Sequence, residues 1–127
     1  MKASEISLTV YLQHILESIE RIESYVEGIA FKDFEQASMI QDAVVRNMEV
    51  MGEASHNIIK FFPAYTKANA HIPLVESYGM RCSLAHGYFD ISEKIVWNTI
   101  QDDLPELKEK VLKSLNALSH THQSLHR

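Results

Sequence analysis

The chain has 127 residues and a mass of 14.5 kDa, with 46% hydrophobic and 23% charged residues, the size and composition of one globular domain spanning residues 1–127. Its single cysteine, Cys82, excludes a disulfide framework and a Cys-x-x-Cys zinc or redox motif, and it suits a reducing, cytoplasmic location. The net charge of −5 argues against binding to duplex DNA, and the sequence predicts neither a signal peptide nor a membrane-spanning segment.

An amphipathic helix is predicted first along the chain. Apolar residues recur there at spacings of three and four, the pattern of a helix that buries one face. Ser4 is a candidate N-cap, and Gly28 follows the last apolar position, where the end of a helix favours glycine. The apolar positions are Leu8, Leu12, Ile15, Ile19, Ile22 and Val26.

A second long helix is predicted from near Gln36 to Phe61. Gly52 interrupts its apolar face and suggests that a neighbouring helix approaches closely. Pro63 ends the helix, because the residue before a proline is pushed out of helical geometry. The methionines of this helix, Met39, Met48 and Met51, are interpreted as core residues.

Three further helices are predicted in the second half of the chain. A loose stretch from Ala64 to Ala70 leads into a helix over residues 72–85, and another helix begins at Ser92. Residues 103–106 predict the start of a further helix, with Pro105 in its first turn. Residues 119–127 are expected to be a frayed tail. The fold class is therefore all-α, an antiparallel bundle of four main helices plus a short fifth.

Several possible sites are weak. No phosphate-binding glycine motif, HExxH motif or EF-hand loop occurs. His120, His122 and His126 lie in the predicted tail without a carboxylate partner, so a solvated tail is favoured over a metal site and no metal is expected. His14 is interpreted as a boundary residue of the first helix, and Trp97 as a core or interface residue.

The acidity of the chain is confined to one end. Residues 1–43 carry three basic and eight acidic side chains, whereas residues 44–127 carry nine of each. The distribution gives no broad basic surface for duplex DNA, but it leaves room for a small phosphate-binding site in the second part of the chain.

An arginine, a histidine and a tyrosine collect around Gly87, near a predicted helix end. Arg81 offers a planar fork that matches phosphate oxygens, and His86 follows the helix, where free carbonyls favour an imidazolium. Together with Tyr88 these groups suffice for metal-free chemistry on a phosphodiester. The five residues from Arg81 to His86 rotate an ideal helix by about 500°, so the two residues do not share one face. The alternative from spacing alone is structural: Arg81 pairs with a carboxylate such as Glu53, His86 caps the helix and Tyr88 packs.

The pattern Arg81-x4-His86-x-Tyr88 resembles the R-x4-H-x-Y signature of HepT-like toxins, a branch of the HEPN superfamily of helical ribonuclease domains. The block of residues 41–54, which ends in Gly52-Glu53-Ala54, is similar to the second-helix block of that family. Val96-Trp97 and residues 103–107 follow in the family order. The resemblance covers about residues 5 to 115.

The resemblance implies an all-α homodimer in which two motifs meet at the subunit interface and form a ribonuclease cleft. Arg81 and His86 would be the catalytic pair, supported by Cys82 and Gly87, and RNA would be the substrate, with no cofactor. The family partner is a minimal nucleotidyltransferase, the MNT antitoxin, which attaches AMP to the tyrosine that corresponds to Tyr88. The chain departs from the family at Cys82, where a polar asparagine or aspartate is common, and a thiol is a weak hydrogen-bond donor.

Two other functions are compatible with the same sequence. A HEPN module whose motif has decayed at Cys82 would bind a nucleotidyltransferase without cleaving RNA. A structural helical adaptor would do neither.

Overall fold

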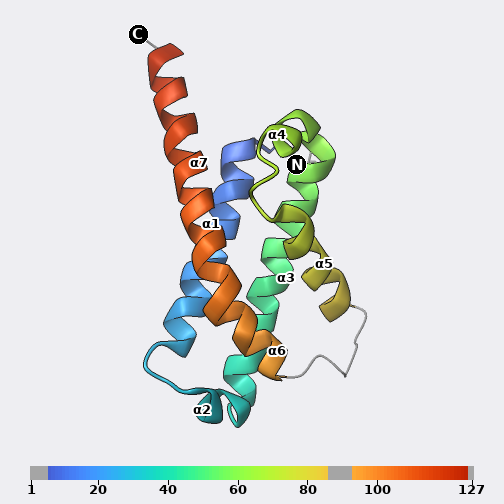
Figure 1. Cartoon of the computed structure of the whole chain (residues 1–127), viewed down its shortest axis with the longest axis vertical. Helices are drawn as coiled ribbons and strands as arrows, with labels where there is room; N and C mark the ends of the chain where they lie inside the picture. Colours follow the sequence, from blue (N-terminus) through green and yellow to red (C-terminus); the bar gives the residue numbers. More distant parts are fainter. Residues whose placement is uncertain (1–5, 86–92, 126–127) are drawn as a thin grey trace.

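The protein is an antiparallel helical bundle, as the sequence predicts. The structure is a computed structural model that describes residues 6–85 and 93–125, with the side chains of residues 6–80 and 93–119. Figure 1 shows the bundle lengthwise, with α1, α3, α5 and α7 as its long elements. No β-strand occurs within the described ranges, which confirms the all-α class. The elements are α1 (Leu8–Val26), α2 (Phe31–Glu35), α3 (Ser38–Phe61), α4 (Pro63–Ala68), α5 (Leu74–Ala85), α6 (Glu93–Asn98), η2 (Thr99–Asp103) and α7 (Leu104–Leu125).

Helix α1 begins one turn later than its predicted cap. The side chain of Ser7 caps the helix by accepting a hydrogen bond from the Val10 amide at 3.3 Å, so Ser4 is not the N-cap. Gly28 has φ of 75°, the left-handed conformation that glycine adopts readily after a helix. The predicted seam is confirmed, because Leu12, Ile15, Ile19 and Ile22 are fully buried.

Helix α2 is short and was not predicted. It is held by Phe34, which is fully buried and packs against Trp97 with ring centroids 5.3 Å apart. Trp97 therefore packs against the core, as one of its two interpretations proposed. Because α2 has only five residues, its single buried ring leaves no periodic pattern in the sequence.

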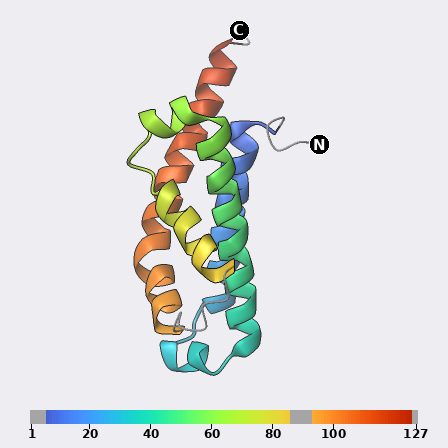
Figure 2. The same cartoon turned by 90° about the vertical axis from the view of Figure 1, so that its right-hand side faces the viewer.

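Helix α3 confirms the second predicted helix and passes through the centre of the bundle. Figure 2 shows it beside α1, with α5 running along it in the opposite direction. Gly52 is buried in this helix. Met48 and Met51 are core residues, but Met39 is 85% exposed, so its assignment to the core is wrong. Met39 lies in the first turn of α3 on its exposed side, whereas the neighbouring Ile40 packs against the core.

The stretch after α3 is more ordered than predicted. Pro63 starts α4, since its missing amide hydrogen is not needed in the first turn of a helix. The Tyr65 hydroxyl forms a short hydrogen bond with the Ser114 hydroxyl of α7. This contact between residues far apart in the sequence fixes a segment that local composition predicts as a loop.

The fourth and fifth predicted helices are one continuous element. Residues 98 and 104 both have right-handed helical dihedrals, and the turn between them, η2, is a π-helix in which the Leu104 amide donates to the carbonyl of Thr99. Pro105 has no amide hydrogen, and its ring would clash with a carbonyl four residues earlier. Helix α7 begins at Leu104 with Pro105 in its first turn, as predicted, but the wider π turn accommodates the proline and joins α7 to α6 without a break.

Helix α7 is also longer than predicted. It continues to Leu125 instead of fading after Leu118, and it extends past the other helices in Figure 1. The ammonium group of Lys108 ties α7 to α1 by a 2.8 Å contact with the Glu23 carboxylate. None of the described helices is both long and apolar enough to cross a lipid bilayer.

Candidate functional site

Helix α5 carries the first two residues of the predicted motif. The helix is anchored at its start, where Ile72 and Leu74 are buried and the Ser77 amide donates to the carbonyl of Pro73 at 3.2 Å. The backbone of Arg81 and Cys82 lies toward the opposite end of the helix, which the structure describes as far as Ala85. The helix starts at Leu74 rather than at Ile72, and its predicted end lies at the edge of the described residues.

Most of the predicted motif lies outside the part of the chain that the structure describes. This is true of His86, Gly87 and Tyr88 and of the side chains of Arg81 and Cys82. Therefore the juxtaposition of arginine, histidine and tyrosine stays a prediction from the sequence. In the predicted tail, the backbones of His120 and His122 belong to α7, and their side chains lie outside the description.

A stacked pair of rings joins α5 to α3 close to Arg81. The imidazole of His56 on α3 and the ring of Tyr78 on α5 are 4.5 Å apart between centroids, with an angle of 22° between their planes. Both side chains are half-buried. Tyr78 precedes Arg81 by three residues, so the two residues occupy neighbouring positions on one face of α5. The pair could not be predicted from the sequence, because His56 and Tyr78 belong to different helices and neither stands in a recognisable motif.

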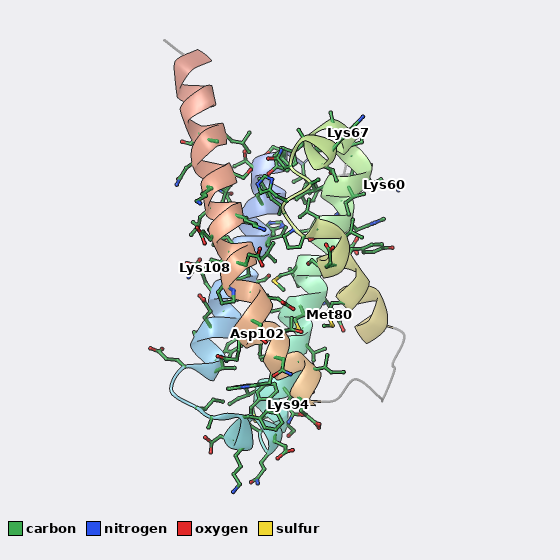
Figure 3. The ribbon with its side chains drawn as sticks, in the orientation of Figure 1. Lys60, Lys67, Met80, Lys94, Asp102 and Lys108 are labelled. Carbon is green, nitrogen blue, oxygen red and sulfur yellow. The ribbon has the colours of Figure 1, made fainter. Side chains whose placement is uncertain are left out.

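An apolar cavity lies on the other side of α5. It has a volume of about 200 Å³ and lies between α3, α5 and the continuous helix formed by α6, η2 and α7. Met80 of α5 lines it, and Figure 3 shows this side chain between α5 and the neighbouring helices. The Ser77 hydroxyl is buried and has no hydrogen-bond partner among the described residues.

Charge makes this cavity unsuitable for a phosphate. Its charged lining residues are Glu76, Asp103 and Glu106. A hydrogen bond from Lys110, at 2.6 Å, lowers the pKa of Glu106 and keeps that carboxylate ionised. Ionised carboxylates in the lining repel an anionic ligand, so this cavity does not suit a phosphate group.

The lysines near the other end of α3 provide positive charge. Figure 3 shows Lys60 at the end of α3 and Lys67 on α4, on the same side of the molecule. Both are exposed, and the Lys60 ammonium lies 5.3 Å from the centroid of the Phe61 ring. Lys60 follows His56 by one helical turn.

Two other tyrosines remain neutral phenols. Burial raises the pKa of Tyr11, and the nearby carboxylate of Glu53 raises it further. Burial likewise raises the pKa of Tyr65, which the hydrogen bond with Ser114 offsets in part. A phenol with a raised pKa is a poor nucleophile at neutral pH, so neither side chain is a candidate for reaction.

Comparison with known proteins identifies relatives over most of the chain. A family model described as "Ribonuclease HepT-like" matches residues 15–114. A protein of Thermococcus cleftensis named "Probable ribonuclease HepT" is 40% identical over 103 residues, covering 81% of this chain and 91% of the relative. A protein of Caldanaerobacter subterraneus named "Putative RNase TTE0752" is 38% identical over 105 residues, covering 83% of this chain and 91% of the relative.

A third relative is a longer protein. It comes from Methanocaldococcus jannaschii, is named "Gamma-glutamylcyclotransferase and putative RNase MJ0434", and is 40% identical over 110 residues. The aligned region covers 86% of this chain but only 48% of that relative. No solved structure matches the chain significantly.

Proposed function

Since the chain belongs to the ribonuclease HepT-like family, we propose that it is an endoribonuclease that cleaves RNA without a metal ion. The observation that carries this proposal is the family match over residues 15–114, which includes α3, α5 and the whole Arg81-x4-His86-x-Tyr88 motif. The all-α bundle supports it, because it supplies the scaffold that the family resemblance implies.

The proposed chemistry is an internal transfer at phosphorus. The ribose 2′-oxygen attacks the adjacent phosphorus and loses its proton to a general base, while the bond from phosphorus to the 5′-oxygen breaks and that oxygen takes a proton from a general acid. The products are a 2′,3′-cyclic phosphate and a 5′-hydroxyl. His86 serves as base or acid, and Arg81 stabilises the negative charge that develops on the phosphate oxygens.

A second copy of the chain completes the proposed site. The single motif histidine of each chain supplies only one of the two proton-transfer groups, so His86 of the second copy takes the other role. Two copies of Arg81 and His86 also concentrate positive charge in one cleft, which allows a chain with a net charge of −5 to bind RNA.

We therefore expect a homodimer with two-fold symmetry. Light scattering at micromolar concentrations should give about twice the chain mass of 14.5 kDa. A mass of one chain throughout that range would contradict the composite site, even if the protein cleaved RNA.

The proposal includes a biological role as the toxin of a cytoplasmic toxin–antitoxin pair. Its antitoxin would be an MNT-type nucleotidyltransferase that attaches AMP to Tyr88. The motif tyrosine supports this role, since neither the proposed acid–base chemistry nor phosphate binding requires it. A gene for a small nucleotidyltransferase beside this one would support the pairing.

Cleavage of RNA in the presence of EDTA tests the proposed activity. Purified protein should degrade total RNA with excess EDTA, and the fragments should carry 2′,3′-cyclic phosphate ends. Cleavage that requires added Mg²⁺ would contradict the metal-free mechanism. An absence of cleavage under both conditions, with retained binding to a nucleotidyltransferase, would favour the non-catalytic HEPN module.

A further inference from the structure

We propose that the His56–Tyr78 pair is a stacking platform for one base of a single-stranded RNA substrate, next to the phosphate that is cleaved. The inference rests on the proposed function and names a binding subsite that the sequence motif does not include. It starts from two half-buried rings that lie nearly parallel, 4.5 Å apart, on adjacent helices. Single-stranded nucleic acids are commonly bound by stacking of their bases on aromatic side chains.

The position of the His56–Tyr78 pair fits an RNA strand that runs along the bundle toward the Arg81-x4-His86-x-Tyr88 motif. Helices α3 and α5 are antiparallel in Figures 1 and 2, so Lys60 and Arg81 lie on opposite sides of the stacked rings along the helix axes. Lys60 is four residues after His56, and Arg81 is three residues after Tyr78. At about 1.5 Å of rise per residue, the two cationic positions are about 10 Å apart along the bundle. Stacked nucleotides rise about 3.4 Å each, so the interval accommodates about three of them.

Charge indicates that a base, rather than a phosphate, occupies the platform. On α3, His56 stands between Glu53 and Lys60, one turn to either side, so one charge of each sign lies next to the platform. The rings themselves carry no phosphate-binding cation, and an aromatic base is the group that stacks on them. The phosphates on either side of the base are then placed toward Lys60 and Arg81.

The same chain contains a matched control. His14 and Tyr11 of α1 also form a histidine–tyrosine pair, but their rings meet edge to face, with an angle of 86° and a centroid separation of 6.5 Å. Tyr11 is only 2% exposed. This pair therefore offers no parallel stack that a base would extend, although it resembles the first pair in composition.

The binding experiment uses short RNA strands that this mechanism does not cleave. Every ribose carries a 2′-O-methyl group, which removes the attacking hydroxyl, and one position carries either 2-aminopurine or no base. The full-length protein should bind the 2-aminopurine strand more tightly than the abasic strand, and the fluorescence of the base should be quenched. His56→Gln should raise the Kd by about tenfold, as expected for the loss of one stacked base, and should remove the preference over the abasic strand.

Three controls separate stacking from structural roles. His56→Phe keeps a flat ring and should retain wild-type affinity, and His14→Gln should bind like the wild type. Melting temperatures and light scattering of His56→Gln should match the parent. A loss of the dimer in this variant, or an equal loss of affinity in His56→Gln and His56→Phe, would overturn the platform.

The outcomes also separate this inference from the proposed nuclease activity. RNA cleavage with an unchanged KM in His56→Gln would overturn the platform and leave the nuclease standing. Stacking of 2-aminopurine on a protein that cleaves no RNA would do the reverse. A wild-type protein that binds neither strand would overturn the platform directly.

Discussion

Replacing His86 with alanine should lower the rate of RNA cleavage by about 10²- to 10⁴-fold, since a positioned acid or base contributes about that much. Arg81→Ala should cause a loss of about 10²- to 10³-fold, because it removes stabilisation of the transition-state charge. Growth of cells that express either variant should recover in parallel with the loss of cleavage. Single-turnover rates on RNA with excess EDTA measure the effect without contributions from product release.

Helicity and dimer mass should be unchanged in both variants, because the proposal assigns these residues to chemistry rather than to the core. Cys82→Asn is the matched control on the same stretch of α5. It introduces the residue that is common in the family, so cleavage should rise or stay the same. Parental activity in either alanine variant would reject the catalytic assignment, and a large loss in Cys82→Asn would reveal a role for the thiol.

Attachment of AMP to Tyr88 should abolish cleavage without unfolding the bundle. In this reaction the phenolic oxygen attacks the α-phosphorus of ATP, pyrophosphate leaves, and the phenolic proton passes to a base on the nucleotidyltransferase. The phenol has an ordinary pKa of about 10, so it needs such an enzyme to react at neutral pH. The added phosphate brings negative charge and bulk within two residues of His86, where they would compete with RNA.

Intact mass after co-expression with the adjacent nucleotidyltransferase measures this modification. Increments of AMP should appear in the parent and vanish in Tyr88→Phe. Tyr25→Phe is the matched control, because Tyr25 lies on α1 and is 36% exposed, and its increments should persist. Increments that persist in Tyr88→Phe would place the modification at another residue. A silenced toxin without any increment would indicate an antitoxin that acts by binding alone.

Much of the bundle was predictable because long amphipathic helices repeat their signal. The apolar face of α1 repeats the helical spacing at six positions, so a single polar residue at one of them would not change the predicted helix. Helix α2 has no such redundancy, and its formation depends on the contact between Phe34 and Trp97, 63 positions apart in the sequence. Pro105 lies in the first turn of α7, as predicted, but the π turn before it joins α7 to α6 without a break, and a helix-starting residue does not indicate that continuity.

The candidate site divides in the same way. Arg81, His86 and Tyr88 could be predicted as site residues because their spacing matches a family signature, and that information is local. The ring pair of His56 and Tyr78 could not be predicted, because neither residue belongs to a sequence motif. The two rings meet only because the antiparallel helices α3 and α5 pack side by side.

The amino-acid sequence by itself determined the helical class, the main helices and the motif residues, since these depend on periodicity and spacing along the chain. The tertiary structure decided the continuity of α6 with α7, the ordering of α2 and α4, and the partner of Tyr78. These features depend on packing between distant segments, whose free energy is gained only when the whole bundle forms. The platform beside Arg81 is therefore a property of the folded bundle and not of any single helix.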